Sequence, residues 1–178
     1  PLAILLCMTR LLSGCDDNTD GPLIPEPDVL ESSGGVLQVT LTAAPAQITV
    51  AGQTFTSNVF NGEYIPPVLQ LERGDVLELK LINRIGPADI EIDAAQDTNL
   101  HYHGMSIPPV APADDIYLHI LPTAEFDYRW QVPFDHPQGT HWYHPHPHGF
   151  VEPQILSGMS GMLIIEGLLE DRYPAFAE

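Results

Sequence analysis

Two closely spaced pairs of histidines carry the side chains of this chain that are best suited to catalysis or metal binding. His101 and His103 form one His-x-His pair, and His144 and His146 form a second pair further along the chain. Residues i and i+2 of an extended chain project to the same face, so each pair is predicted to present two imidazoles together. Imidazole nitrogens suit copper, zinc, nickel and iron. Either pair alone could equally be two polar residues on a solvated strand face, but two pairs set among aromatic residues and glycine predict a metal site.

Prolines around the second pair indicate where in a sheet it lies. Pro145 and Pro147 alternate with His144, His146 and His148. Proline has no N–H and cannot serve the hydrogen-bond ladder of a central strand. The second pair is therefore predicted at a strand end or on a rim loop, where a metal ion can reach it.

The composition sets the class of protein and excludes one class of partner. The 178 residues, 44% of them hydrophobic, predict one globular domain with a sizeable core. Six lysines and arginines against 24 acidic residues give a net charge of -18. Such a charge repels nucleic-acid phosphates, so we exclude nucleic-acid binding. The charge could concentrate cations such as copper ions, and an ordinary acidic surface explains it equally well.

The first 34 residues are predicted to precede the folded domain. Residues 1–15 contain an apolar run that is too short for a membrane span and resembles the end of a secretory signal peptide, incomplete at its start. Its last four residues, Leu-Ser-Gly-Cys at 12–15, resemble the lipobox of bacterial lipoproteins, in which the cysteine carries lipid. We therefore expect an exported, periplasmic or cell-envelope lipoprotein, with the lipid as its only membrane contact. Residues 16–34 are rich in Asp, Asn, Pro, Gly and Ser and predict a flexible linker.

Short apolar runs separated by turn signals predict an all-β fold after this linker. In residues 76–83 three leucines alternate with other residues, and in residues 125–132 Phe, Tyr, Trp and Val alternate with polar residues, so each run has one buried face. Many short strands with frequent turns are typical of a β-sandwich or barrel. Further strands are predicted at residues 36–41, 48–50, 53–56, 68–71 and 161–166, with a tight turn at 51–52.

The histidine motifs and their surroundings resemble the multicopper oxidases, the family that includes the laccases. The resemblance covers nearly all of residues 36–173. Residues 100–104, Leu-His-Tyr-His-Gly, resemble the first copper motif of the family. Residues 139–146, Gly-Thr-His-Trp-Tyr-His-Pro-His, resemble the second. Residues 61–76 resemble the opening strands, and Gln154, Gly158 and the run from Gly161 to Ile165 resemble the tail of the second motif.

The resemblance implies both a fold and a copper centre. It implies an all-β, cupredoxin-like Greek-key β-sandwich at residues 35–170, followed at 171–178 by the start of an interdomain linker. It implies that His101 binds the type 2 copper of a trinuclear cluster. His103, His144 and His146 would bind the type 3 copper pair.

Other polar residues have less definite roles. Asp114 or Asp115 resembles the acid that family members place near the cluster to relay protons, and either could instead be a solvated loop carboxylate. His141 and His148 fall outside the matched ligand positions and are expected behind the ligands or at the surface. The remaining two histidines of the domain, His119 and His136, are expected to be structural or exposed.

The resemblance implies an oxidase of which this chain is the N-terminal cupredoxin domain. Family members oxidise phenols or metal ions at a blue copper and reduce O2 to water at the cluster. The blue copper needs a cysteine thiolate, and both cysteines of this chain, Cys7 and Cys15, precede the domain. The four matched histidines would supply half the cluster ligands. The chain alone is thus expected to be inactive, and its partners would be O2, a small reducing substrate and the remaining cupredoxin domains, in the same or another chain.

The histidine motifs leave three alternatives to the oxidase. Copper nitrite reductases, a related family, place Cys directly after the His of the second motif. This chain has Pro145 there, which argues against that family. An exported copper-binding or copper-resistance lipoprotein without turnover would keep the histidines as a storage site. A purely structural cupredoxin domain would leave them empty.

Overall fold

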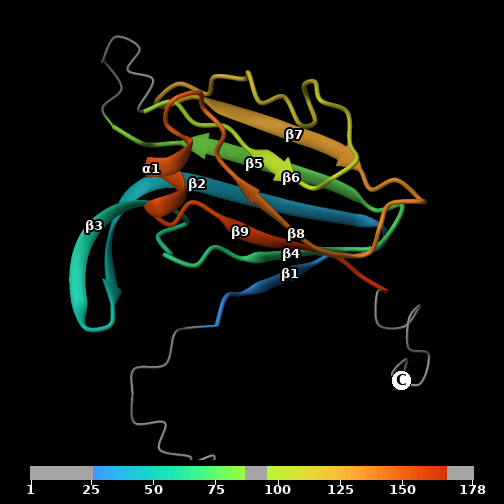
Figure 1. The fold of residues 1–178 in the computed structure, drawn as a ribbon, viewed down its shortest axis with the longest axis horizontal. Helices are drawn as coiled ribbons and strands as arrows, with labels where there is room; N and C mark the ends of the chain where they lie inside the picture. The colour runs from blue at the N-terminus through green and yellow to red at the C-terminus, as the bar shows by residue number, and fades with distance from the viewer. Residues whose placement is uncertain (1–25, 87–95, 168–178) are drawn as a thin grey trace, which may run out of the picture.

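Two β-sheets packed face to face form the part of the chain that the computed structural model describes, residues 26–86 and 96–167 (Figure 1). The five-stranded sheet has the strand order β1-β4-β9-β8-β6, and the four-stranded sheet has the order β3-β2-β5-β7. The predicted all-β sandwich is confirmed. The strands are β1 (Val29–Glu31), β2 (Val36–Val50), β3 (Gln53–Phe60), β4 (Val68–Leu71), β5 (Val76–Asn83), β6 (His101–His103), β7 (Glu125–Gln131), β8 (Gly139–His144) and β9 (Gly161–Ile165).

Alternating apolar residues hold the two sheets together. Leu77, Leu79 and Leu81 of β5 are almost completely buried, as their alternation predicts. Tyr128 and Trp130 of the adjacent strand β7 point into the same core. Their burial removes a large apolar area from water, the dominant favourable term in folding.

Strand β2 is one continuous strand where the sequence analysis predicts two. Its first half, Val36–Ala43, pairs in parallel with β5, and its second half, Ala43–Val50, pairs in antiparallel fashion with β3. Pro45 lies in the second half of β2, which has a paired strand, β3, on one side only. The missing N–H of Pro45 therefore interrupts no hydrogen bonding with a second neighbouring strand. The predicted turn is confirmed: Ala51 and Gly52 both have positive φ angles, as a two-residue hairpin turn of type I′ requires.

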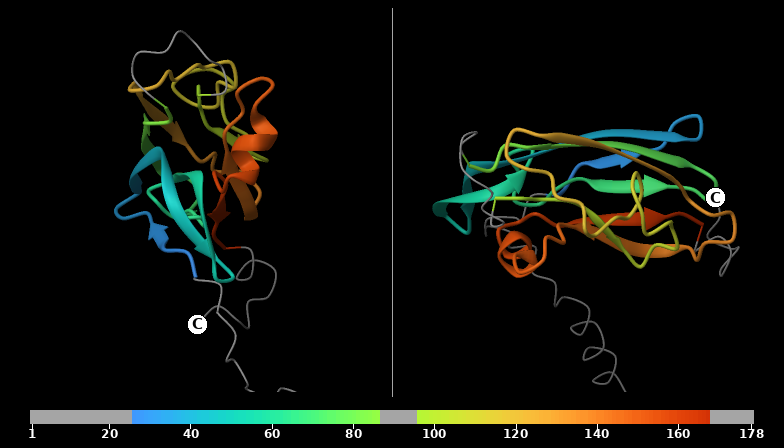
Figure 2. Two further views of the ribbon diagram at one scale, coloured as in Figure 1. Left: turned by 90° about the vertical axis from the view of Figure 1, so that its left-hand side faces the viewer. Right: turned by 90° about the horizontal axis from the view of Figure 1, so that it is seen from above.

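Two elements do not follow from the sequence patterns. Strand β1 pairs in parallel with β4, although its residues belong to the interval that the sequence analysis assigns to a linker, so the ordered sheet begins before residue 35. Helix α1 (Val151–Leu156) is only six residues long, too short to show a helical period. It lies at the same end of the sandwich as the β2–β3 hairpin (Figure 2), and the Ser57 hydroxyl of β3 donates a hydrogen bond to the Ser157 carbonyl. Within the described ranges, no helix has the length and apolar character needed to cross a bilayer.

Candidate metal centre

The two His-x-His segments lie side by side because they belong to neighbouring strands. β6 and β8 pair in antiparallel fashion, with His101 opposite His144 and His103 opposite Trp142. β8 ends at His144, the residue before Pro145, so His146 lies on the loop that follows. The predicted position of the second pair, at a strand end and rim loop, is confirmed.

The structure brings together all four histidines that the sequence singles out. The His101 ring centroid lies 5.4 Å from that of His103, 5.3 Å from that of His144 and 5.3 Å from that of His146. One ring nitrogen each from His101, His103 and His144 lies within 4.8 Å of the others. These three imidazoles are therefore close enough to serve a common metal centre, with His146 beside them.

The hydrogen bonding of His144 leaves one ring nitrogen free to bind a metal ion. Its Nδ1 lies 2.8 Å from the Pro145 carbonyl oxygen, which can only accept, so Nδ1 carries the proton. Its Nε2 is then an unprotonated acceptor, buried and without a hydrogen-bond donor among the described residues. Burial of the ring, the main cause, lowers the pKa of His144 to about 4, which keeps the imidazole neutral. A buried lone pair without a donor fits a metal ion, and an all-imidazole donor set suits copper as well as zinc, nickel or iron.

His101 is oriented by a carboxylate in the same way. Its Nδ1 lies 3.0 Å and 2.9 Å from the two carboxylate oxygens of Asp114, which also accepts a 2.9 Å hydrogen bond from the backbone N–H of Tyr102. An Nδ1–H held by a carboxylate leaves Nε2 for a metal, a common arrangement of metal-binding histidines.

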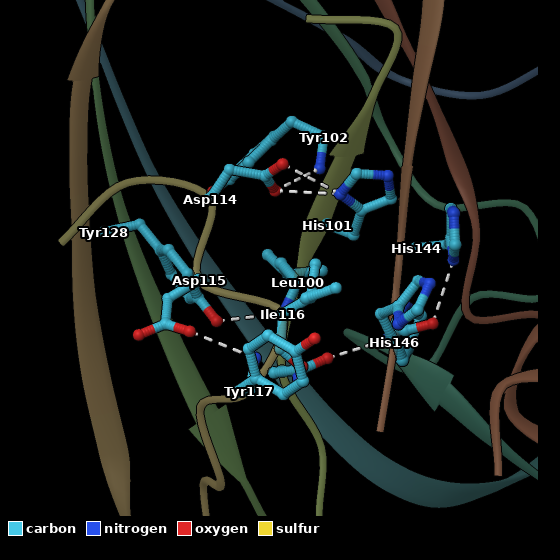
Figure 3. A network of polar contacts seen from close by, with 12 residues as sticks. Leu100, His101, Tyr102, Asp114, Asp115, Ile116, Tyr117, Tyr128, His144 and His146 are labelled. Carbon is cyan, nitrogen blue, oxygen red and sulfur yellow. Dashed lines mark hydrogen bonds and ion pairs between the residues drawn. The ribbon is translucent and has the colours of Figure 1, made fainter. Parts of the chain in front are cut away.

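The geometry separates the two aspartates that the sequence leaves open. Asp114 is buried and faces the His101 ring, whereas Asp115 is half-buried and accepts a hydrogen bond from the Tyr117 backbone N–H (Figure 3). Of the two, Asp114 is thus the one in contact with the histidine cluster.

Trp142 restricts the rings of two clustered histidines. Its ring stacks on His144 at a centroid distance of 4.0 Å and on His103 at 5.0 Å. The next residue, Tyr143, is fully buried, and its hydroxyl donates a 2.7 Å hydrogen bond to the Pro67 carbonyl. These contacts fix the strand that carries His144.

The other histidines of the described chain lie outside the cluster. His136 uses both ring nitrogens, since Nε2 accepts a hydrogen bond from the Ser106 N–H and Nδ1 donates to the Pro137 carbonyl. His141 packs edge-on against the His136 ring. His119 is 60% exposed and pairs with Asp97, and His148 is exposed. His119 and His136 are thus exposed and structural respectively, as expected.

One polar residue of the site is not singled out by the sequence patterns. Asn99 is fully buried, and its Oδ1 accepts a 2.6 Å hydrogen bond from the backbone N–H of His146. The signal that could have found it is its spacing: Asn99 is two residues before His101, and so belongs to the same face of an extended segment.

Comparison with known proteins identifies what the described fold and site resemble. Residues 42–169 match the family described as multicopper oxidase. A multicopper oxidase of Staphylococcus epidermidis is 30% identical over 153 residues, which cover 84% of this chain and 32% of the relative. A copper resistance protein A homolog of Pseudomonas syringae pv. tomato is 29% identical over 147 residues, covering 80% of this chain and 22% of the relative.

Solved structures give the same result for the fold. A structure described as a multicopper oxidase from Campylobacter jejuni, a metallo-oxidase, superposes with a TM-score of 0.64 at 26% identity and covers 80% of this chain and 30% of that one. The predicted cupredoxin-like sandwich is thereby confirmed. The chain spans about a third or less of the length of these relatives.

Some predictions concern residues that the structure does not describe. The signal peptide and lipobox at residues 1–15, with Cys7 and Cys15, lie outside the described residues, as do residues 16–25 of the predicted linker and residues 171–178. The boundaries of the domain stay a prediction.

Proposed function

Because the chain belongs to the multicopper oxidase family, we propose that it is a copper-binding cupredoxin domain that supplies half the ligands of a trinuclear copper cluster. The observation that carries this proposal is the convergence of four imidazoles from two neighbouring segments, with the unprotonated Nε2 of His144 buried among them. In this proposal His101 binds the type 2 copper, and His103, His144 and His146 bind the type 3 pair.

Bound copper would supply the redox chemistry, taking up electrons one at a time and passing them to O2. The chain's own contribution is to hold the imidazoles neutral and oriented. Asp114 fixes the tautomer of His101 through the Nδ1 contact, and Trp142 limits rotation of the His103 and His144 rings.

We also assign the proton-relay role to Asp114. Reduction of O2 to water consumes protons, and a carboxylate can hold and release a proton beside the cluster. The contact between the Asp114 carboxylate and the His101 ring supports Asp114 over Asp115.

The oxidase reaction needs parts that come from elsewhere in the full assembly. We propose that further cupredoxin domains, in the same or another chain, provide the remaining cluster ligands and a blue copper with a His-Cys-His motif. Phenols or metal ions would be oxidised at that copper.

Copper calorimetry tests the binding part of this function. The chain as it stands is titrated with Cu(II), beside a double variant carrying His101→Ala and His144→Ala. We expect saturable uptake by the native chain and a large loss in the double variant. Equal uptake by both proteins would show that His101 and His144 do not bind the copper.

A second candidate function is copper handling without turnover, and the similarity to a copper resistance protein A homolog favours it. In that case the chain would be an exported lipoprotein of the cell envelope that holds copper. Oxygen consumption separates the two functions. The oxidase proposal predicts copper-dependent O2 uptake with a phenol once a domain bearing His-Cys-His is present, whereas the handling proposal predicts copper binding with no O2 uptake in either case.

A further inference from the structure

Asn99 forms three hydrogen bonds that join two separate segments of the site. Its Oδ1 accepts from the His146 N–H at 2.6 Å, and its Nδ2 donates to the carbonyls of Ile116 at 3.1 Å and Leu118 at 2.9 Å. Ile116 and Leu118 belong to the segment that follows Asp114, and His146 belongs to the loop after β8. One buried side chain therefore contacts the backbone of both segments.

The prolines make this contact important for the position of His146. Pro145 and Pro147 have no backbone N–H, so the His146 N–H is the single backbone donor of residues 145–147. That donor is used by Asn99. Over residues 145–147 the backbone therefore has one hydrogen-bond donor, and Asn99 is the group that accepts from it.

We propose that Asn99 is a positioning residue of the metal centre, which sets the place of His146 relative to His101. This inference rests on the proposed copper-binding function. Asn99 precedes β6 by two residues, so its backbone moves with His101 while its side chain holds His146. The two bonds to the Ile116 and Leu118 carbonyls orient the amide, because they fix which end of the side chain is the donor.

Removing the side chain should free His146 without touching any ring nitrogen. In Asn99→Ala the His146 N–H loses its acceptor, and the ring is no longer held beside His101. Loss of a contact that holds a metal ligand in place, without itself touching the metal, typically weakens metal affinity about 10- to 100-fold.

Asn83 provides a matched control. It is fully buried, its Oδ1 accepts from the Ile85 N–H at 2.8 Å, and its Nδ2 donates to the carbonyls of Gln96 and Ile120. It has the same burial and the same three types of bond as Asn99, but it forms no bond to His146. Asn83→Ala should lower stability while leaving the position of His146 unchanged.

The first experiment uses the copper-free chain and measures amide hydrogen exchange at His146. We expect slow exchange in the native chain and in Asn83→Ala, and exchange at least about tenfold faster in Asn99→Ala, because the amide has lost its bond. Unchanged exchange in Asn99→Ala would overturn the proposal. If that variant does not fold, Asn99→Leu replaces it: the side chain keeps nearly the same size but offers no acceptor, so exchange at His146 should again be faster than in the native chain, and unchanged exchange would overturn the proposal.

The second experiment measures Cu(II) affinity by calorimetry in a double-mutant cycle with His146→Ala. We expect Asn99→Ala to weaken binding about tenfold in the native background and to have no effect when His146 is already alanine. An equal effect in both backgrounds would show a general structural role and overturn the positioning role. Failure of the native chain to bind copper would instead refute the proposed function, while the exchange measurement still decides whether Asn99 holds His146.

Discussion

Among single residues, two of the proposed ligands, His101 and His144, are prepared for metal by the group that accepts a hydrogen bond from the far side of the ring. The Nδ1–H of His101 is held by Asp114 and that of His144 by the Pro145 carbonyl, so both rings are fixed in one tautomer. His146 is held through its backbone by Asn99 rather than through its ring. Orientation of ligands before binding lowers the cost of ordering them when the metal arrives.

The two neighbouring aspartates should differ in their effect on copper binding. Asp114→Ala removes the partner of His101 Nδ1 and is expected to weaken Cu(II) binding roughly tenfold. Asp115→Ala is the matched control, because it removes a carboxylate of equal charge that does not contact the cluster. Calorimetry on both variants is the check, and equal losses would indicate a general charge effect instead.

His141 should make the copper-free chain less stable in acid. Burial, and next the His136 ring, lower the pKa of His141 below its ordinary value of 6.5, while a hydrogen bond to Pro137 acts in the opposite direction. The unfolded chain therefore binds this proton more readily than the folded chain, so stability is complete above about pH 6.5 and falls as the pH drops below it.

The variant His141→Phe keeps an aromatic ring at this position and removes the titration. Urea midpoints measured with a chelator at pH 7 and pH 5 should fall less in the variant than in the native chain. The slope that one proton can contribute is at most about 1.4 kcal/mol per pH unit. Parallel pH profiles would contradict this role of His141.

At the scale of elements, the site exists because β6 and β8 are neighbours in register. The sequence was sufficient to predict the strands with clear alternation, such as β5 and β7, and to place both histidine pairs on extended segments. It could not distinguish Asp114 from Asp115, because that choice depends on how the loop folds back onto His101. Nor could it indicate β1, whose three residues pair in parallel with a strand distant in sequence.

The contact between β8 and β9 requires glycine at position 161. Gly161 lies opposite Tyr143, and a Cβ added there would lie 2.4 Å from the tyrosine ring. Gly161→Ala must displace Tyr143, which is fully buried and bonded to the Pro67 carbonyl, so we expect a loss of about 2–3 kcal/mol in the free energy of unfolding.

Gly52→Ala provides the comparison for this prediction. Gly52 has a φ of +77° and no atom within 4 Å of an added Cβ, so only the backbone term of about 1 kcal/mol is expected. Urea denaturation of both variants measures the difference. A loss at Gly161 no larger than that at Gly52 would show that Tyr143 can move aside freely.

At the scale of the whole molecule, one sandwich presents a histidine cluster on an edge strand and its neighbour. β6 is the last strand of its sheet and β8 is the next, so the cluster lies at a border of the fold rather than within the core. The exposed His103 contrasts with the buried His144 in this cluster. A cluster at such a border is consistent with ligands arriving from a second domain, as proposed.

The charge of the whole chain should affect copper uptake. A net charge of -18 attracts Cu(II), and salt screens that attraction. Raising the ionic strength from about 0.01 M to about 1 M shortens the Debye length from roughly 30 Å to roughly 3 Å, so we expect slower Cu(II) association. Stopped-flow quenching of tryptophan fluorescence measures the rate of Cu(II) association. A rate that does not change with salt would show that the net charge does not assist copper uptake.

The proposed function requires the four imidazoles to bind copper together. The most direct test is diffraction from crystals of the chain grown with Cu(II), recorded at the copper absorption edge. We expect anomalous peaks in contact with ring nitrogens of His101, His103, His144 and His146. Peaks confined to other histidines, such as His119 or His148, with none at this cluster, would contradict it.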